Sequence, residues 1–133
     1  MDICPKFQSL FSSNDKDHMF SILNEIQLND IVINQSNEEL YINAIDNIYT
    51  IFSTKNKMLY EKTFDIIIHI IKNVNEWIIP DICFKIHKLG QNNQRCQMEY
   101  SYKILKYIVE NYKKNIKITM PTLIPLISID VND

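Results

Sequence analysis

The stretch that decides the fold is KMLYEKTFDIIIHIIKNV, residues Lys57 to Val74. Its apolar side chains recur at i, i+3 and i+4, which is the spacing of one face of an α-helix. Ile66 and Ile70 widen this face until the helix is apolar on most of its sides. A helix of this kind is buried between neighbouring helices. The stretch therefore predicts a helix over 57–74 with other helices packed around it.

The composition supports helices as the main secondary structure. The chain has 133 residues, of which 46% are hydrophobic and 23% charged, and these values suit a single domain, 1–133, with its own core. It contains 1 glycine and 4 prolines, whereas hairpin turns and phosphate-binding loops depend on glycine. The net charge of −2 is unlike that of a polycation that binds nucleic acid along its whole surface. We therefore predict an all-α fold.

The same apolar spacing predicts further helices on both sides of the opening stretch, after an irregular N-terminus at 1–14. Their predicted ranges are 15–28, 36–53, 77–89, 95–114 and 119–131. Ser36, followed by Glu39 three residues later, is a predicted capping box at the start of the second of these helices. Pro80 suits the first turns of the helix over 77–89, and Gly90 is predicted to end that helix in the left-handed conformation.

Two helix openings are alike and lie about forty residues apart. They are WIIPDI at Trp77–Ile82 and MPTLIPL at Met120–Leu126. A period near 40 with two helices in each unit is typical of an α-solenoid. We therefore predict a short right-handed α-solenoid of about six helices, with antiparallel pairs at 36–74 and 77–114. The segment 119–131 would be a terminal half-repeat.

At this level the sequence resembles HEAT repeats, in particular those in the N-terminal region of fungal-type translation elongation factor three. The similarity lies in Ile48–Asn75, in IIPDI at Ile78–Ile82 and in ITMPTLIPLISIDVND at Ile118–Asp133. The arginine that usually follows in the second helix of a HEAT repeat is absent. The chain also lacks a GxxxxGK stretch, so the resemblance does not imply ATPase activity. It implies a binding scaffold, and in that family the HEAT region contacts the ribosome.

We therefore expect a non-enzymatic scaffold that docks on a larger assembly, either the ribosome or another ribonucleoprotein. The expected contact surface is formed by the second helix of each pair, 57–74 and 95–114. It includes the basic end of the helix over 95–114, where tyrosines and lysines alternate, and the uncovered side of the terminal half-repeat. That uncovered side would meet a partner or a second copy of the chain. The alternative is a compact helical bundle that antagonises host signalling through a hydrophobic groove. The residues expected to bind are Lys103, Lys106, Tyr107, Lys113, Lys114, Lys117, Leu126 and Ile129.

Other candidate residues are better explained by packing than by chemistry. Cys83 and His87 have the i, i+4 spacing of two metal ligands, and Cys96 and His69 are the residues that would complete a site. We instead expect Cys83 in the core and His87 on a solvated or capping face, with no metal and no cofactor. The sequence has neither paired carboxylates in an apolar setting nor a serine in a glycine elbow, so no pattern in it suggests an enzyme. Trp77, the single tryptophan, is predicted to be a buried wedge between helix pairs.

The sequence also bears on location. Three cysteines form an odd number with no CxxC pair, which fits a reducing compartment better than a disulfide framework. The N-terminus has no basic region followed by an apolar core, and no apolar run is long enough to cross a bilayer. We expect a cytoplasmic protein without a membrane contact.

Overall fold

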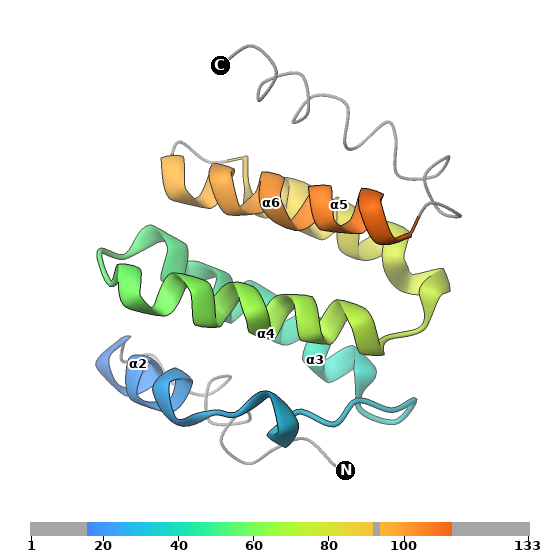
Figure 1. The fold of residues 1–133 in the computed structure, drawn as a ribbon, viewed down its shortest axis with the longest axis horizontal. Coiled ribbons are helices and arrows are strands. Elements are labelled where there is room, and N and C mark those ends of the chain that lie inside the picture. Colours follow the sequence, from blue (N-terminus) through green and yellow to red (C-terminus); the bar gives the residue numbers. More distant parts are fainter. Residues whose placement is uncertain (1–15, 92–93, 113–133) are drawn as a thin grey trace. The chain divides into compact units, whose positions relative to one another are not determined.

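The computed structural model describes residues 16–91 and 94–112, and all the regular secondary structure in those ranges is helical, as the sequence predicts (Figure 1). The chain forms two compact units, Met1–Val74 and Asn75–Asp133. The α-helices are α2 (Lys16–Glu25), α3 (Glu38–Ile48), α4 (Tyr60–Asn73), α5 (Ile79–Leu89) and α6 (Arg95–Asn111). Short 3₁₀ helices join or extend them: η1 (Leu28–Asp30), η2 (Tyr49–Ser53), η3 (Lys57–Leu59) and η4 (Glu76–Ile78).

Helix α4 is the centre of the first unit. It contacts α2, α3 and the 3₁₀ helices η1, η2 and η3 (Figure 1). Its isoleucines lie on several sides of the helix and are all buried, because neighbours cover most of the circumference. The prediction that this stretch forms a buried helix is confirmed. The buried isoleucines of α4 are Ile66, Ile67, Ile68, Ile70 and Ile71.

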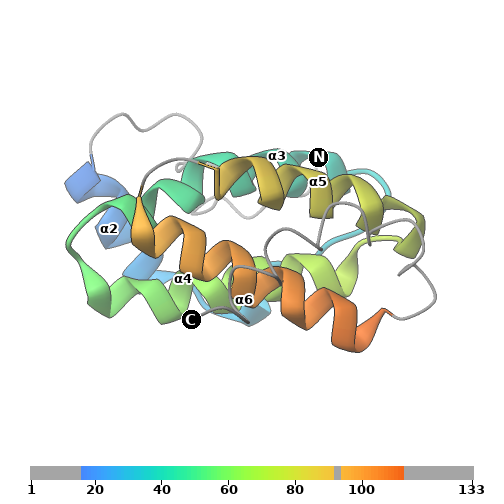
Figure 2. The same cartoon turned by 90° about the horizontal axis from the view of Figure 1, so that it is seen from above.

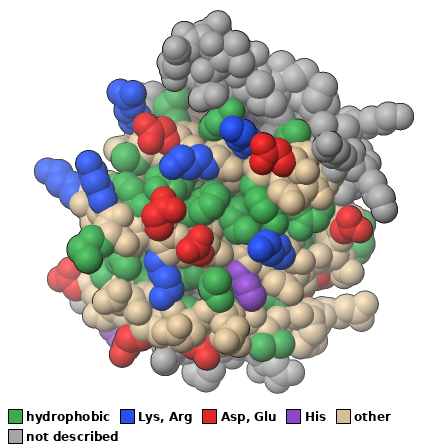
Figure 3. Space-filling view, viewed as in Figure 1, with side chains coloured by type: hydrophobic (Ala, Val, Ile, Leu, Met, Phe, Trp, Pro, Cys, Tyr) green, Lys and Arg blue, Asp and Glu red, His purple; other side chains and the backbone are tan. Residues whose placement is uncertain are grey.

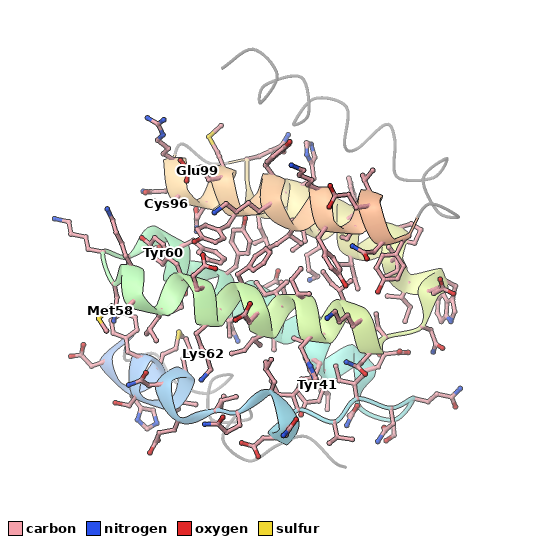
Figure 4. All side chains as sticks on the ribbon, in the orientation of Figure 1. Tyr41, Met58, Tyr60, Lys62, Cys96 and Glu99 are labelled. Atoms are coloured by element: carbon pink, nitrogen blue, oxygen red, sulfur yellow. The ribbon has the colours of Figure 1, made fainter. Side chains whose placement is uncertain are left out.

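Helices α3 and α4 are joined by a polar turn with an aromatic cluster beneath it. The ring centroids of Tyr49 and Phe52 are 5.0 Å apart, and those of Phe52 and Tyr60 are 5.6 Å apart, both in edge-to-face geometry. The Tyr60 hydroxyl donates a hydrogen bond to the carbonyl oxygen of Thr54 in the turn. The aromatic side chains thereby link the end of η2 to the start of α4, where Figure 4 labels Tyr60.

The segment before α3 is held by asparagine side chains. Asn34 Oδ1 accepts hydrogen bonds from the Ser36 backbone N–H (2.9 Å) and from the Ser36 hydroxyl (2.6 Å). Asn37 is fully buried, its Nδ2 donates to the Val32 carbonyl (2.9 Å), and its Oδ1 accepts from the Asn34 N–H (2.8 Å). The predicted Ser36–Glu39 capping box is therefore wrong. The N-cap residue is Asn37, because the Ser36 hydroxyl is already used inside the preceding turn.

A long-range hydrogen bond ties the same segment to α4. Ile31 is buried, and its carbonyl oxygen accepts a hydrogen bond from His69 Nε2 at 2.8 Å, across 38 residues of sequence. The carbonyl has no proton to give, so Nε2 is the protonated nitrogen of this imidazole. Of the other apolar residues in this link, Val32 is exposed and Ile33 half-buried.

The second unit is an antiparallel hairpin of α5 and α6, whose ribbons lie side by side (Figure 2). Pro80 lies in the first turn of α5, as predicted. Gly90 follows α5 with φ −85° and ψ −3°, so the prediction of a left-handed residue there is wrong. The glycine is required for another reason: a Cβ atom on Gly90 would lie 2.4 Å from Ser101 Cβ and 2.5 Å from Ser101 Oγ. The absence of a side chain at Gly90 permits α6 to approach the end of α5.

Ser101 fixes this close approach. Its hydroxyl donates a hydrogen bond of 3.0 Å to the carbonyl oxygen of Ile86, which also accepts from the Gly90 N–H at 3.1 Å. The contact rotates α6 away from the predicted orientation. Leu105 and Ile108 are buried as predicted, but four residues of the predicted apolar face are only half-buried: Met98, Tyr102, Val109 and Tyr112. The other buried residues of α6 are Gln97, Tyr100, Ser101 and Ile104.

The predicted helix ranges that fall in the described parts of the chain are close to the observed ones. The range 36–53 corresponds to α3 followed by η2, 57–74 to η3 followed by α4, and 77–89 to η4 followed by α5. The sixth helix at 119–131 and the irregular segment at 1–14 lie outside the described residues. The solenoid arrangement and the single domain stay predictions. Among the described helices, none has the length and apolar character that a membrane crossing requires.

Candidate functional site

The exposed face of α6 carries the described part of the predicted binding surface. Lys103 and Lys106 are both exposed and, three residues apart on a helix, they are neighbours on one face. The remaining exposed charges on this face are Arg95, Glu99 and Glu110. Three cations and two anions give the face a net charge of +1. Blue and red side chains are accordingly interspersed over α6 in Figure 3, and Figure 4 labels Glu99 near the start of the helix.

Some of these charges have partners on α6 itself. Arg95 Nε lies 3.5 Å from Glu99 Oε1, one helical turn away, and both side chains are largely solvent-exposed. A pair of this kind contributes only about 0.3–0.5 kcal/mol. Lys103 Nζ lies 4.5 Å from the centroid of the Tyr100 ring, which is cation–π geometry. The buried Tyr100 ring therefore holds one of the two predicted lysines in place.

Tyr107, the third predicted residue in the described range, is half-buried at the end of α6. Its ring centroid lies 6.4 Å from that of Tyr112. Burial raises the pKa of Tyr107, and the side-chain hydrogen bond with Tyr112 partly opposes this. Burial also raises the pKa of Tyr112, with smaller contributions from the charges of Tyr107 and Glu76. Both phenols are therefore neutral at pH 7.

The rest of the predicted surface lies outside the described residues. This applies to Lys113, Lys114 and Lys117, which follow α6 in the sequence, and to Leu126 and Ile129 on the predicted terminal half-repeat. Their roles stay predictions.

A second exposed face, on η4 and the helix α5 that follows it, was not predicted. Trp77 and Phe84 are 72% and 56% exposed, respectively. The predicted packing wedge at Trp77 is therefore wrong, because most of this side chain is in solvent and not between helices. We call Trp77, Asp81, Phe84 and Lys88 the α5 stripe; all four are exposed, at positions i, i+4, i+7 and i+11.

The sequence does contain a signal for the α5 stripe. The buried residues of the same helix have the complementary spacing, and a helical wheel centred on them places Trp77 and Phe84 on the solvent side. Residue type misled the prediction, because a large aromatic side chain is usually found in a core. The buried residues of α5 are Ile79, Ile82, Cys83 and Ile86.

Cys83 and His87 do not form a metal site with the described residues. Cys83 is fully buried, as expected, and burial raises the pKa of its thiol to about 12, which disfavours the thiolate that a metal requires. The Gln91 side-chain amide lies 3.1 Å from His87 Nε2. His69, in the first unit, is hydrogen-bonded to Ile31. No group of three His, Cys, Asp or Glu side chains within 16–91 and 94–112 has the arrangement of a metal site.

The first unit also exposes isolated apolar side chains. Met58 is 90% exposed on η3, where Figure 4 labels it. Val32 is 63% exposed in the link before α3. Single apolar side chains on a surface are common and need no binding partner. The exposed aromatic residues Trp77, on η4, and Phe84, on α5, differ because they are seven residues apart, a spacing of about two helical turns that brings side chains to the same side.

Comparison with protein-family models, with curated proteins and with solved structures finds no match to this chain.

Proposed function

We propose that this chain is a non-enzymatic binding module that docks on a ribonucleoprotein through the exposed face of α6, with the ribosome as the first candidate. The observation that carries the proposal is the exposure of Lys103 and Lys106 on one helical face beside the half-buried Tyr107. Lysines bind phosphate oxygens as mobile cations, and tyrosines add stacking and hydroxyl contacts. The sequence continues this pattern with Lys113, Lys114 and Lys117.

The low net charge of the α6 face sets the expected strength of binding. Because Glu99 and Glu110 lie on the same face, the net charge of that face is too low to attract a partner over a long range. Binding then depends on a few phosphate contacts at close range. Each such contact releases counterions and contributes about 0.7–0.9 to the slope of log affinity against log salt. We therefore expect modest affinity that falls as salt is raised.

Co-sedimentation with purified ribosomes tests the proposal. The chain should pellet with ribosomes at about 50 mM salt and progressively dissociate by about 200 mM, as expected for a small number of phosphate contacts. Lys103→Glu combined with Lys106→Glu should reduce the bound fraction several-fold and flatten the salt dependence. Both side chains are exposed, so circular dichroism should show an unchanged fold.

A matched control makes the same change of charge elsewhere. Lys55→Glu combined with Lys57→Glu alters two exposed lysines of the first unit and should leave binding unchanged. An equal loss in both double variants would show that net charge, and not the α6 face, governs the interaction. Failure of the unaltered chain to sediment with ribosomes at low salt would reject a ribosomal partner.

A further inference from the structure

The α5 stripe combines exposed aromatic surface with two opposite charges. Asp81 lies three residues before Phe84 and Lys88 four residues after it, and all three are exposed. Trp77 extends the stripe by about one turn at its N-terminal end. If each aromatic side chain has about 200 Å² of surface, the observed exposed fractions leave about 250 Å² of aromatic surface in solvent per chain.

This face is self-complementary when two copies run in opposite directions. We propose that the α5 stripe is the contact surface for a second copy of this chain, in an antiparallel dimer with its two-fold axis beside Phe84. An axis at that level sets Phe84 against Phe84 of the second copy. It also brings Asp81 level with Lys88 of the second copy, and the symmetry repeats this ion pair on the other side. The contact is of the isologous kind that closes a two-fold dimer.

The spacing within one helix satisfies this register. Asp81 and Lys88 are seven residues apart, about 10.5 Å along the axis, and are nearly equidistant from the proposed two-fold. Trp77 then lies one turn beyond the ion pair, within reach of the methylene groups of Lys88 of the second copy. That lysine already lies 5.9 Å from the centroid of its own Phe84 ring, so its ammonium group sits at the aromatic surface before pairing.

Interactions within a single copy account for part of this pattern. An acidic residue in the first turn and a basic residue in the last turn favour the helix dipole of an isolated α5. The dipole does not explain why Trp77 and Phe84 share the exposed face with these charges. Two large aromatic side chains on one solvent-facing stripe are typical of an interface.

The available area indicates a weak, reversible dimer. Two copies contribute about 500 Å² of aromatic surface, and flanking side chains add to it, but a stable interface buries about 1,200–2,000 Å². Dimerisation should therefore depend on protein concentration and should appear at tens to hundreds of micromolar, not at nanomolar concentrations. This proposal is independent of the α6 face and its ribosomal partner.

Analytical ultracentrifugation of the full chain over a concentration series tests the dimer. Trp77→Ser combined with Phe84→Ser should keep the chain monomeric. Asp81→Lys and Lys88→Glu, each alone, place like charges opposite one another and should weaken dimerisation at least ten-fold. The double variant D81K/K88E should regain it, and an equimolar mixture of the two single variants should form heterodimers. Circular dichroism should be the same for all variants, because the four side chains are exposed.

The charge-reversal variants of Asp81 and Lys88 distinguish the proposed antiparallel register from other modes of self-association. A chain that stays monomeric at every concentration overturns the proposal, and so does a double variant as weak as either single variant. A further variant, Leu126→Ser with Ile129→Ser, checks the predicted C-terminal contact. Loss of the dimer in that variant, with the α5 stripe variants unaffected, would assign self-association to the C-terminal segment and also overturn the proposal.

Discussion

Replacing Gly90 by alanine tests how α5 and α6 are held together. Gly90 has a helical φ of −85°, a conformation in which alanine is normally the more stable residue by about 0.4–1 kcal/mol. Here the added methyl would lie 2.4 Å from Ser101 Cβ, and one helix must move away from the other. Overpacking of this kind costs about 1–3 kcal/mol. Displacement of Ser101 also weakens its hydrogen bond to Ile86, which contributes about 1 kcal/mol.

These terms together predict that Gly90→Ala lowers the free energy of unfolding by about 1–3 kcal/mol. Urea denaturation followed by circular dichroism at 222 nm measures the change. The control is a double-mutant cycle with Ser101→Gly, which removes the Cβ that the new methyl would meet. In that background Gly90→Ala should be neutral or stabilising. A Gly90→Ala protein as stable as the original, or an equal cost in the Ser101→Gly background, would refute the reasoning.

Three further predictions concern buried polar and titratable groups. The hydroxyl of Thr63 is buried without a hydrogen-bond partner among the described residues, so Thr63→Val should raise the unfolding free energy by about 1 kcal/mol in urea melts. Thr54→Val is the control and should lower it, since the Thr54 hydroxyl donates to a carbonyl at 2.7 Å. The buried thiol of Cys83, with its pKa raised from 9.0 to about 12, favours the folded state fully below pH 9, and this contribution is lost progressively between pH 9 and 12. The loss should reach about 1.4 kcal/mol by pH 10, and Cys83→Ala but not Cys96→Ala should remove this part of the pH dependence of unfolding. Asn37→Ala should cost about 1–2 kcal/mol in the same melts because it removes two part-buried hydrogen bonds, from the Asn34 N–H to Asn37 Oδ1 and from Asn37 Nδ2 to the Val32 carbonyl, and a cost below about 0.5 kcal/mol would contradict the role given to this side chain.

Much of the helical structure was predictable from the sequence for a simple physical reason. Apolar residues must be buried, and their spacing of three and four residues marks one side of a helix wherever a polar turn separates two such runs. The helix predicted over 95–114 is observed as α6, Arg95–Asn111. The helix predicted over 57–74 is observed as η3 and α4, Lys57–Asn73.

Features that depend on contacts between helices were not predictable. A glycine after a helix suggested a left-handed residue, but Gly90 is required because the side chain of Ser101, eleven residues later, leaves no room for a Cβ atom. Spacing in the sequence does not reveal such a contact. The same contact decides which side of α6 is buried. The α6 sequence has tyrosines on both sides, so its apolar pattern favours two orientations almost equally. Packing selects the one that buries Tyr100 and leaves Tyr102 half-exposed.

Of the predicted binding residues, the exposure of two lysines was predictable from the sequence, and their role in binding stays a prediction. Lys103 and Lys106 are exposed, as a lysine-rich helical face requires. Glu99 and Glu110 lie on the same face and lower its net charge, as their helical spacing from the lysines indicates. The α5 stripe was missed because the size of Trp77 was given more weight than its position relative to Ile79 and Ile82.

The hydrogen bond between His69 and Ile31 has a consequence for the order of folding. It closes a loop of 38 residues, whereas the bond from Ser101 to Ile86 closes one of 15. The entropy of loop closure makes the longer loop about 0.8 kcal/mol more costly. Helices α5 and α6 should therefore come together early, and the segment that contains Ile31 should dock on α4 late. Substitutions at Ser101 would then slow folding, and substitutions at His69 would mainly speed unfolding.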